Sequence, residues 1–189
     1  TSTEDIVIEN ECIMAYNDSI MYYKRLIEEK FKKPDIYNSL IVTNAKLDIN
    51  FKYNKIKLVP FGEVLPFEKF LHKLGLKKIT EGYGSFTKGS SSDIFTLGNL
   101  KLLPLICYEI IFPELIQNQK NMIVNISEDA WFGSTIGPHQ HFSKAIFRAI
   151  ESNVYLVRSA NKGFSAFIDN KGVIKKVLKP NESGVIEFN

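Results

Sequence analysis

Two residues in separate parts of the sequence have side chains suited to nucleophilic catalysis. Cys107 directly follows a continuous apolar run, Leu102 to Ile106, and Pro113 then permits a helix to begin. A cysteine between a buried strand and a helix lies on a sharp turn. Such a turn can expose the sulfur at the rim of a sheet while backbone N–H groups face the same space. The other interpretation of Cys107 is a small apolar core residue.

Lys55 is the second of these residues. It ends a predicted strand and precedes a turn that contains Pro60 and Gly62. From a strand end its ammonium can reach an adjoining pocket, where it would lower the pKa of a thiol and stabilise an oxyanion. Taken alone, Lys55 is also compatible with a solvated surface lysine.

The elements that must position these residues alternate between strands and helices and then close in hairpins. The helical periodicity is clearest over residues 137–152, where Phe142, Ala145 and Ala149 share one face. A turn at 169–172 joins two of the later strands. These patterns predict a mixed α/β layered fold. Helices are expected at 19–33, 67–74 and 137–152, strands at 6–8, 37–43, 47–53, 102–106, 122–126, 154–159, 163–168, 173–178 and 184–188, and a surface loop at 82–93.

Composition narrows the class of protein. The 189 residues suit one domain, and the formal net charge of +3 comes from basic residues scattered among acids. That pattern argues against a nucleic-acid surface. The two cysteines, Cys12 and Cys107, indicate neither a disulfide framework nor a zinc site. No stretch is long and apolar enough for a membrane span, so the chain alone is predicted to be soluble.

Five segments together resemble a known family. They are 55–63 (Lys-Ile-Lys-Leu-Val-Pro-Phe-Gly-Glu), 125–133 (Asn-Ile-Ser-Glu-Asp-Ala-Trp-Phe-Gly), 137–141, 148–151 and 157–163. The chain resembles the nitrilase (carbon-nitrogen hydrolase) superfamily, in the form found in apolipoprotein N-acyltransferases, from about residue 5 to its end. The resemblance implies an αββα sandwich over residues 1–189, shortened towards the N-terminus and either complete or missing one strand there.

The resemblance also implies site residues. Cys107 is then the nucleophile, Lys55 the oxyanion-stabilising lysine and Glu11 the general base, which needs hydrogen-bond reach of the thiol. Supporting positions are Glu63, Tyr108 and Glu109. Substrate contacts are expected from Trp131, Phe132 and His141, although a core role stays open for the two aromatic residues and a structural role for His141.

The chain also departs from the family pattern. Glu9 and Asn10 stand where a Trp-Pro pair normally precedes the first glutamate, and the stretch 14–36 is too short for the usual strand and connection. Glu128 replaces an asparagine and Lys162 a small polar residue. The membrane-spanning helices that flank the catalytic domain of such enzymes have no counterpart in this sequence.

The implied reaction is transfer of an acyl chain from a phospholipid to the N-terminal amine of a diacylated apolipoprotein cysteine, through a thioester on Cys107. It needs no metal or organic cofactor. The family's catalytic domain lies on the periplasmic face of the bacterial inner membrane, so a membrane surface is an expected partner. Two alternatives stay open: a soluble amidase of the same superfamily that hydrolyses C–N bonds, and an inactive truncated remnant.

Overall fold

The computed structural model describes residues 5–9, 12–16, 35–64, 85–91, 93–116 and 120–187, and for the first two ranges it describes the backbone. The predicted helices 19–33 and 67–74 lie outside these residues. So does Glu11. Most of the loop expected at 82–93 is described and contains no helix or strand before β5.

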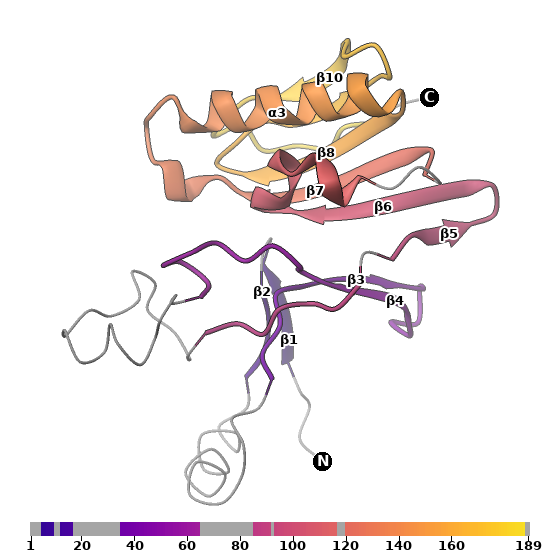
Figure 1. The fold of residues 1–189 in the computed structure, drawn as a ribbon, viewed down its shortest axis with the longest axis vertical. Helices are drawn as coiled ribbons and strands as arrows, with labels where there is room; N and C mark the ends of the chain where they lie inside the picture. The colour runs from indigo at the N-terminus through magenta and orange to yellow at the C-terminus, as the bar shows by residue number, and fades with distance from the viewer. Residues whose placement is uncertain are drawn as a thin grey trace, which may run out of the picture.

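A six-stranded sheet forms the centre of the fold, in the order β10-β9-β8-β7-β6-β5 (Figure 1). Its members are β5 (Phe95–Leu97), β6 (Leu100–Ile106), β7 (Met122–Glu128), β8 (Tyr155–Asn161), β9 (Ser165–Ile168) and β10 (Ile174–Leu178). The strands β6, β7 and β8 run parallel, while β5, β9 and β10 are antiparallel to their neighbours. The carboxyl ends of the three parallel strands therefore meet at one edge, where open α/β sheets place their sites.

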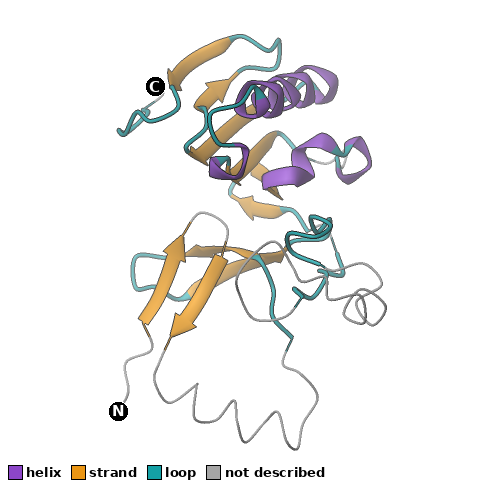
Figure 2. Cartoon of the chain, turned by 90° about the vertical axis from the view of Figure 1, so that its left-hand side faces the viewer, coloured by secondary structure: helices purple, strands orange, loops and turns teal. Residues whose placement is uncertain are grey.

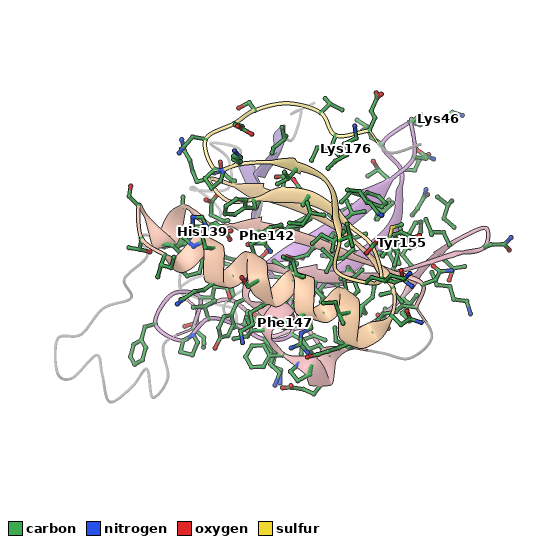
Figure 3. All side chains as sticks on the ribbon, turned by 90° about the horizontal axis from the view of Figure 1, so that it is seen from above. Lys46, His139, Phe142, Phe147, Tyr155 and Lys176 are labelled. Carbon is green, nitrogen blue, oxygen red and sulfur yellow. The ribbon has the colours of Figure 1, made fainter. Side chains whose placement is uncertain are left out.

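Helix α3 (Gly137–Ser152) and two short 3-10 helices, η1 (Cys107–Ile111) and η2 (Pro113–Leu115), lie on one side of this sheet (Figure 2). A further 3-10 helix, η3 (Ala130–Phe132), follows β7. Because side chains alternate along a strand, Leu103 and Leu105 of β6 face this side and pack into one core with Phe142 and Ala145 of α3. Figure 3 shows Phe142 and Phe147 on opposite sides of α3, and Phe147 is exposed.

A second layer of strands packs on the other face. Here β3 (Ser39–Thr43) and β4 (Ile49–Asn54) form an antiparallel hairpin, closed by a turn in which Asn44 bonds the backbone of Lys46 and Asp48. Tyr53 of β4 packs with Ile106 and Cys107 in a second apolar cluster. Two further strands, β1 (Asp5–Glu9) and β2 (Cys12–Tyr16), pair as a separate hairpin. The helix, sheet and strand layers are those of an α/β sandwich.

Most expected elements are confirmed, with differences at the two ends. The helix 137–152, the hairpin turn at Asp169–Gly172 and five strands of the central sheet lie where the patterns predict them, whereas β5 was not expected. The strand expected at 184–188 is wrong for 184–187, which have no strand partner, and residue 188 lies outside the description. Val185 is 85% exposed there, so its β propensity has no neighbouring strand to pack against. The strand β2 was not expected.

Candidate active site

Cys107 lies on a strained turn at the carboxyl end of β6. It is the first residue of η1 and has a φ of +50°, a conformation that costs a non-glycine residue roughly 1–3 kcal/mol. Its sulfur is a free thiol that lies 4.0 Å from the backbone oxygen of Glu128, at the end of the neighbouring β7. The turn thus places Cys107 at the carboxyl end of β6, and its role as a nucleophile stays a prediction. The residue is 8% exposed.

Lys55 is buried in an ion pair at the end of β4. It is 1% exposed, and its Nζ lies 2.9 Å from Oε1 of Glu63. Its backbone N–H donates to the carbonyl of Asn38, and its own carbonyl accepts from Gly89. A side chain at position 89 would meet the backbone of Asn54 at 2.1 Å, which explains the glycine. The interpretation of Lys55 as a solvated surface lysine is therefore excluded.

The carboxylate of Glu63 is held by three donors. Oε1 accepts from the side-chain amide of Asn38 at 2.7 Å as well as from Lys55, and Oε2 accepts from the backbone N–H of Val59 at 2.7 Å. The backbone carbonyl of Asn38 also accepts the N–H of Lys55, so one buried asparagine contacts both members of the ion pair. Asn38 was not among the residues that sequence reasoning singled out.

Glu109 joins the cysteine turn to the lysine strand. Its carboxylate, 0% exposed, accepts from the N–H of Ile106 through Oε2 at 2.8 Å. Its Oε1 accepts from the N–H groups of Ile56 and Lys57 and from the hydroxyl of Tyr53, at 2.7–3.0 Å. Burial raises the pKa of Glu109 above its ordinary value, against these four hydrogen bonds, which lower it. Burial and the neighbouring Glu109 likewise raise the pKa of Tyr53. Glu109 thus bonds the backbone of the residue before Cys107 and of the two residues after Lys55. We call this set of hydrogen bonds the Glu109 anchor.

A cavity of about 350 Å³ opens beside this anchor. Tyr108, which follows the cysteine, is partly buried and packs edge-on against Phe112 with ring centroids 4.9 Å apart. The cavity is lined by Ile56, Lys57, Leu58, Pro60, Val64, Lys88, Tyr108 and Phe112. Its walls are mainly apolar and come from the segments that follow Lys55 and Cys107, but neither of those two residues lines it.

The three residues predicted to contact substrate have different surroundings. Trp131 and Phe132, on η3, are 61% and 37% exposed. Gly137 lies against the Phe132 ring, where a side chain would come within 2.5 Å. His141 of α3 is only 5% exposed and has both ring nitrogens facing protein atoms. Contact with substrate remains a prediction for all three.

A buried polar network behind Cys107 was not foreseen from the sequence. Asp129, at the end of β7, receives two hydrogen bonds from Arg158 of β8, one from Ser127, and contacts His141 Nδ1 at 2.9 Å. Arg158 also bonds Asn125 of β7, its direct neighbour in the strand register. Burial acts to raise the pKa of Asp129, but the hydrogen bonds from His141 and Ser127 and the charge of Arg158 lower it below its ordinary value.

The structure also places Glu128, one of the residues that depart from the family pattern. Glu128 accepts from the N–H of Ala130 and from the side chain of Asn161, so its carboxylate has partners at the carboxyl ends of the strands. Arg148 and Glu151 form an ion pair on α3, at 2.6 Å. Among the residues that the structure describes, no helix combines the length and apolar character needed to cross a bilayer.

The model of the carbon-nitrogen hydrolase family matches residues 14–188. The chain belongs to the carbon-nitrogen hydrolase family. The structure of Nit3 from Saccharomyces cerevisiae, a member of the same superfamily, superposes with a TM-score of 0.58 at 21% identity, over 79% of this chain and 51% of that one. The protein XC1258 from Xanthomonas campestris gives a TM-score of 0.57 at 14% identity, over 81% and 57%. These neighbours confirm the predicted nitrilase-like fold.

Curated relatives of this carbon-nitrogen hydrolase are more similar to it in sequence than these structural neighbours are. An apolipoprotein N-acyltransferase of Allorhizobium ampelinum is 44% identical over 156 residues, which cover 80% of this chain and 30% of the relative. That of Brucella melitensis is 41% identical over 159 residues, or 82% and 30%. The chain therefore spans about a third of the length of these relatives.

Proposed function

We propose that this chain carries the catalytic centre of an acyltransferase. It would move a fatty acyl chain from a phospholipid to the N-terminal amine of a diacylated apolipoprotein cysteine. The similarity to apolipoprotein N-acyltransferases supports the substrates. The observation that carries the chemistry is the Glu109 anchor, which ties the strained Cys107 turn to the strand end that bears the buried Lys55–Glu63 pair.

In the first step the thiol of Cys107 loses its proton to Glu11, and the thiolate attacks the ester carbonyl of the phospholipid. The negative charge that develops on the carbonyl oxygen is stabilised by the ammonium of Lys55 and by the backbone N–H that follows the cysteine. The C–O bond to the glycerol oxygen then breaks, and the proton on Glu11 passes to the departing lysophospholipid alcohol. A thioester on Cys107 remains.

In the second step the amine of the acceptor attacks the thioester carbonyl. The oxyanion occupies the same position, Glu11 takes the proton from the attacking nitrogen, and the C–S bond breaks to give the amide. The thiolate regains that proton, so the site returns to its starting state. Glu11 enters here from the family resemblance, because it lies outside the described residues.

Acyl transfer to Cys107 can be measured directly. The 189-residue chain is incubated with vesicles of phosphatidylethanolamine and phosphatidylglycerol, and intact-mass spectrometry records addition of an acyl group. A synthetic diacylated lipopeptide with a free N-terminal amine is then added as acceptor. We expect acylation of the wild type, none in Cys107→Ala, and a loss of at least about 100-fold in Lys55→Met, the scale of removing one oxyanion donor. Lys46→Met, at an exposed turn, is the matched control.

Two outcomes contradict the proposal. Hydrolysis of short amides in lipid-free buffer, without acylation by vesicles, would identify a soluble amidase of the same family. A folded chain that takes up no acyl group and turns over no amide would be an inactive remnant.

A further inference from the structure

The buried polar network makes one contact with the catalytic turn. Nε2 of His141 lies 3.2 Å from the backbone carbonyl oxygen of Cys107, and its Nδ1 lies 2.9 Å from the carboxylate of Asp129. We propose that His141 is a positioning residue: it holds the Cys107–Tyr108 peptide so that the N–H of Tyr108 faces the reacting carbonyl. This inference rests on the proposed acyl transfer and deepens it.

The first step of the argument is the geometry of the peptide unit. A trans peptide is planar, and its carbonyl and N–H point in opposite directions. Since the Cys107 carbonyl points at His141, on the helix face of the sheet, the N–H of Tyr108 points away from α3. As an early N–H of η1, it has no acceptor within that helix. It is therefore a donor for an oxyanion formed at Cys107.

The second step is the chemistry of the two partners. Nε2 faces the carbonyl oxygen of Cys107, which can only accept, while Nδ1 faces both the carboxylate of Asp129 and a guanidinium nitrogen of Arg158 at 3.2 Å. To bond the Cys107 carbonyl, Nε2 must be the nitrogen that donates. Arg158, whose guanidinium donates to both oxygens of Asp129, fixes that carboxylate in turn.

The third step is the need for such a restraint. With a φ of +50°, Cys107 occupies a backbone conformation that a non-glycine residue keeps only when its surroundings enforce it. Glu109 restrains the turn from the N–H of Ile106, on one side of the cysteine. His141 restrains it from the carbonyl on the other side. Without that second restraint, rotation of the peptide would turn the Tyr108 N–H away from the oxyanion.

Two substitutions of His141 separate positioning from mere structural support. The amide nitrogen of glutamine reaches the place of Nε2, so His141→Gln keeps a donor for the Cys107 carbonyl. The side chain of asparagine reaches only the place of Nδ1, so His141→Asn keeps the contact with Asp129 and loses the donor. His139→Asn is the matched control, because His139 is exposed on the same helix and packs on Phe164.

The assay follows acylation of Cys107 by p-nitrophenyl butyrate, from the release of nitrophenolate, with alkylation by iodoacetamide in parallel. Alkylation consumes the thiolate but builds no oxyanion. We expect H141N to lose about 100-fold in the maximal acylation rate with little change in the half-saturating ester concentration, as for a lost oxyanion donor. H141Q should stay within about tenfold of the wild type, H139N should be unchanged, and alkylation should vary little among all four proteins.

Equal acylation by H141N and the wild type would overturn the inference. So would equal losses in H141N and H141Q that follow their melting temperatures, which would identify a purely structural residue. If H141N does not fold, His141→Met, which fills the space without a donor, is compared with H141Q. Acylation by the nitrophenyl ester but not by phospholipid vesicles would contradict the proposed function and leave the role of His141 intact.

Discussion

The hydroxyl of Tyr53 donates a hydrogen bond to Oε1 of Glu109 across 2.9 Å, between two elements that are far apart in the sequence. Tyr53 lies next to the end of β4, and Glu109 lies in η1, two residues beyond Cys107. Both side chains are buried, so this bond forms in a region of low dielectric constant. It connects the layer that carries Lys55 with the layer that carries Cys107.

Removal of this hydroxyl should therefore weaken the whole centre. We expect Tyr53→Phe to lower the free energy of unfolding by about 1–2 kcal/mol, because the buried carboxyl group of Glu109 loses one donor. Glu109→Gln should cost more, roughly 3 kcal/mol, since an amide cannot accept from donors on both of its ends. Urea denaturation measures both, with the exposed Tyr155→Phe as control. Equal stability of Y53F and the wild type would show that the bond contributes nothing.

The Lys55–Glu63 pair should contribute far more to stability than a surface pair of similar length. Glu63→Gln removes the carboxylate that lies 2.9 Å from the buried ammonium of Lys55, and we expect a loss of about 3–5 kcal/mol. Lys57→Met breaks the ion pair with Glu114, in which the lysine side chain is 35% exposed and the glutamate side chain 55%. This loss should cost less than about 1 kcal/mol. Thermal unfolding of both variants checks the contrast. Similar losses would contradict the burial argument.

Much of this centre follows from the sequence, because its parts carry local signals. The apolar run before Cys107 and the strand before Lys55 predict where each side chain emerges. The stripe on α3 predicts the helix that covers the sheet. Each of these patterns comes from the period of a single element and needs no knowledge of the partner element.

The polar network and the role of Asn38 could not be predicted in this way. Asp129, His141 and Arg158 come from β7, α3 and β8, and each alone resembles an ordinary surface residue in the sequence. Only the strand register, which sets Asn125 opposite Arg158, brings them together. The residues of the network continue the inward-facing rows of Ile123 and Leu156. Polar residues at inward positions of buried strands were the one available signal.

The Asp129 carboxylate should give the protein a distinct dependence of stability on pH. Its pKa in the folded state lies below the ordinary value of about 4, so it contributes stability above that pH. This contribution is lost as the pH falls from about 4 through the lower folded value. We expect the difference in unfolding free energy between wild type and Asp129→Asn to be large at pH 6 and to shrink below about pH 4. Urea titrations at a series of pH values measure it, and a constant difference would contradict the assignment.

Gly163 offers a test of whether the network and the catalytic turn act together. A methyl group at this position would lie 2.1 Å from Oδ2 of Asp129, so Gly163→Ala must displace the carboxylate that holds His141. Gly98→Ala is the matched control: its φ of +58° strains the variant, but nothing lies within 4 Å of the added carbon. Each substitution should cost roughly 1–3 kcal/mol of stability. Only G163A should also slow acylation of Cys107 by p-nitrophenyl butyrate, because only it moves the ring that contacts the Cys107 carbonyl. If G163A and G98A acylate at the same rate, Asp129 and His141 support the fold without controlling the turn.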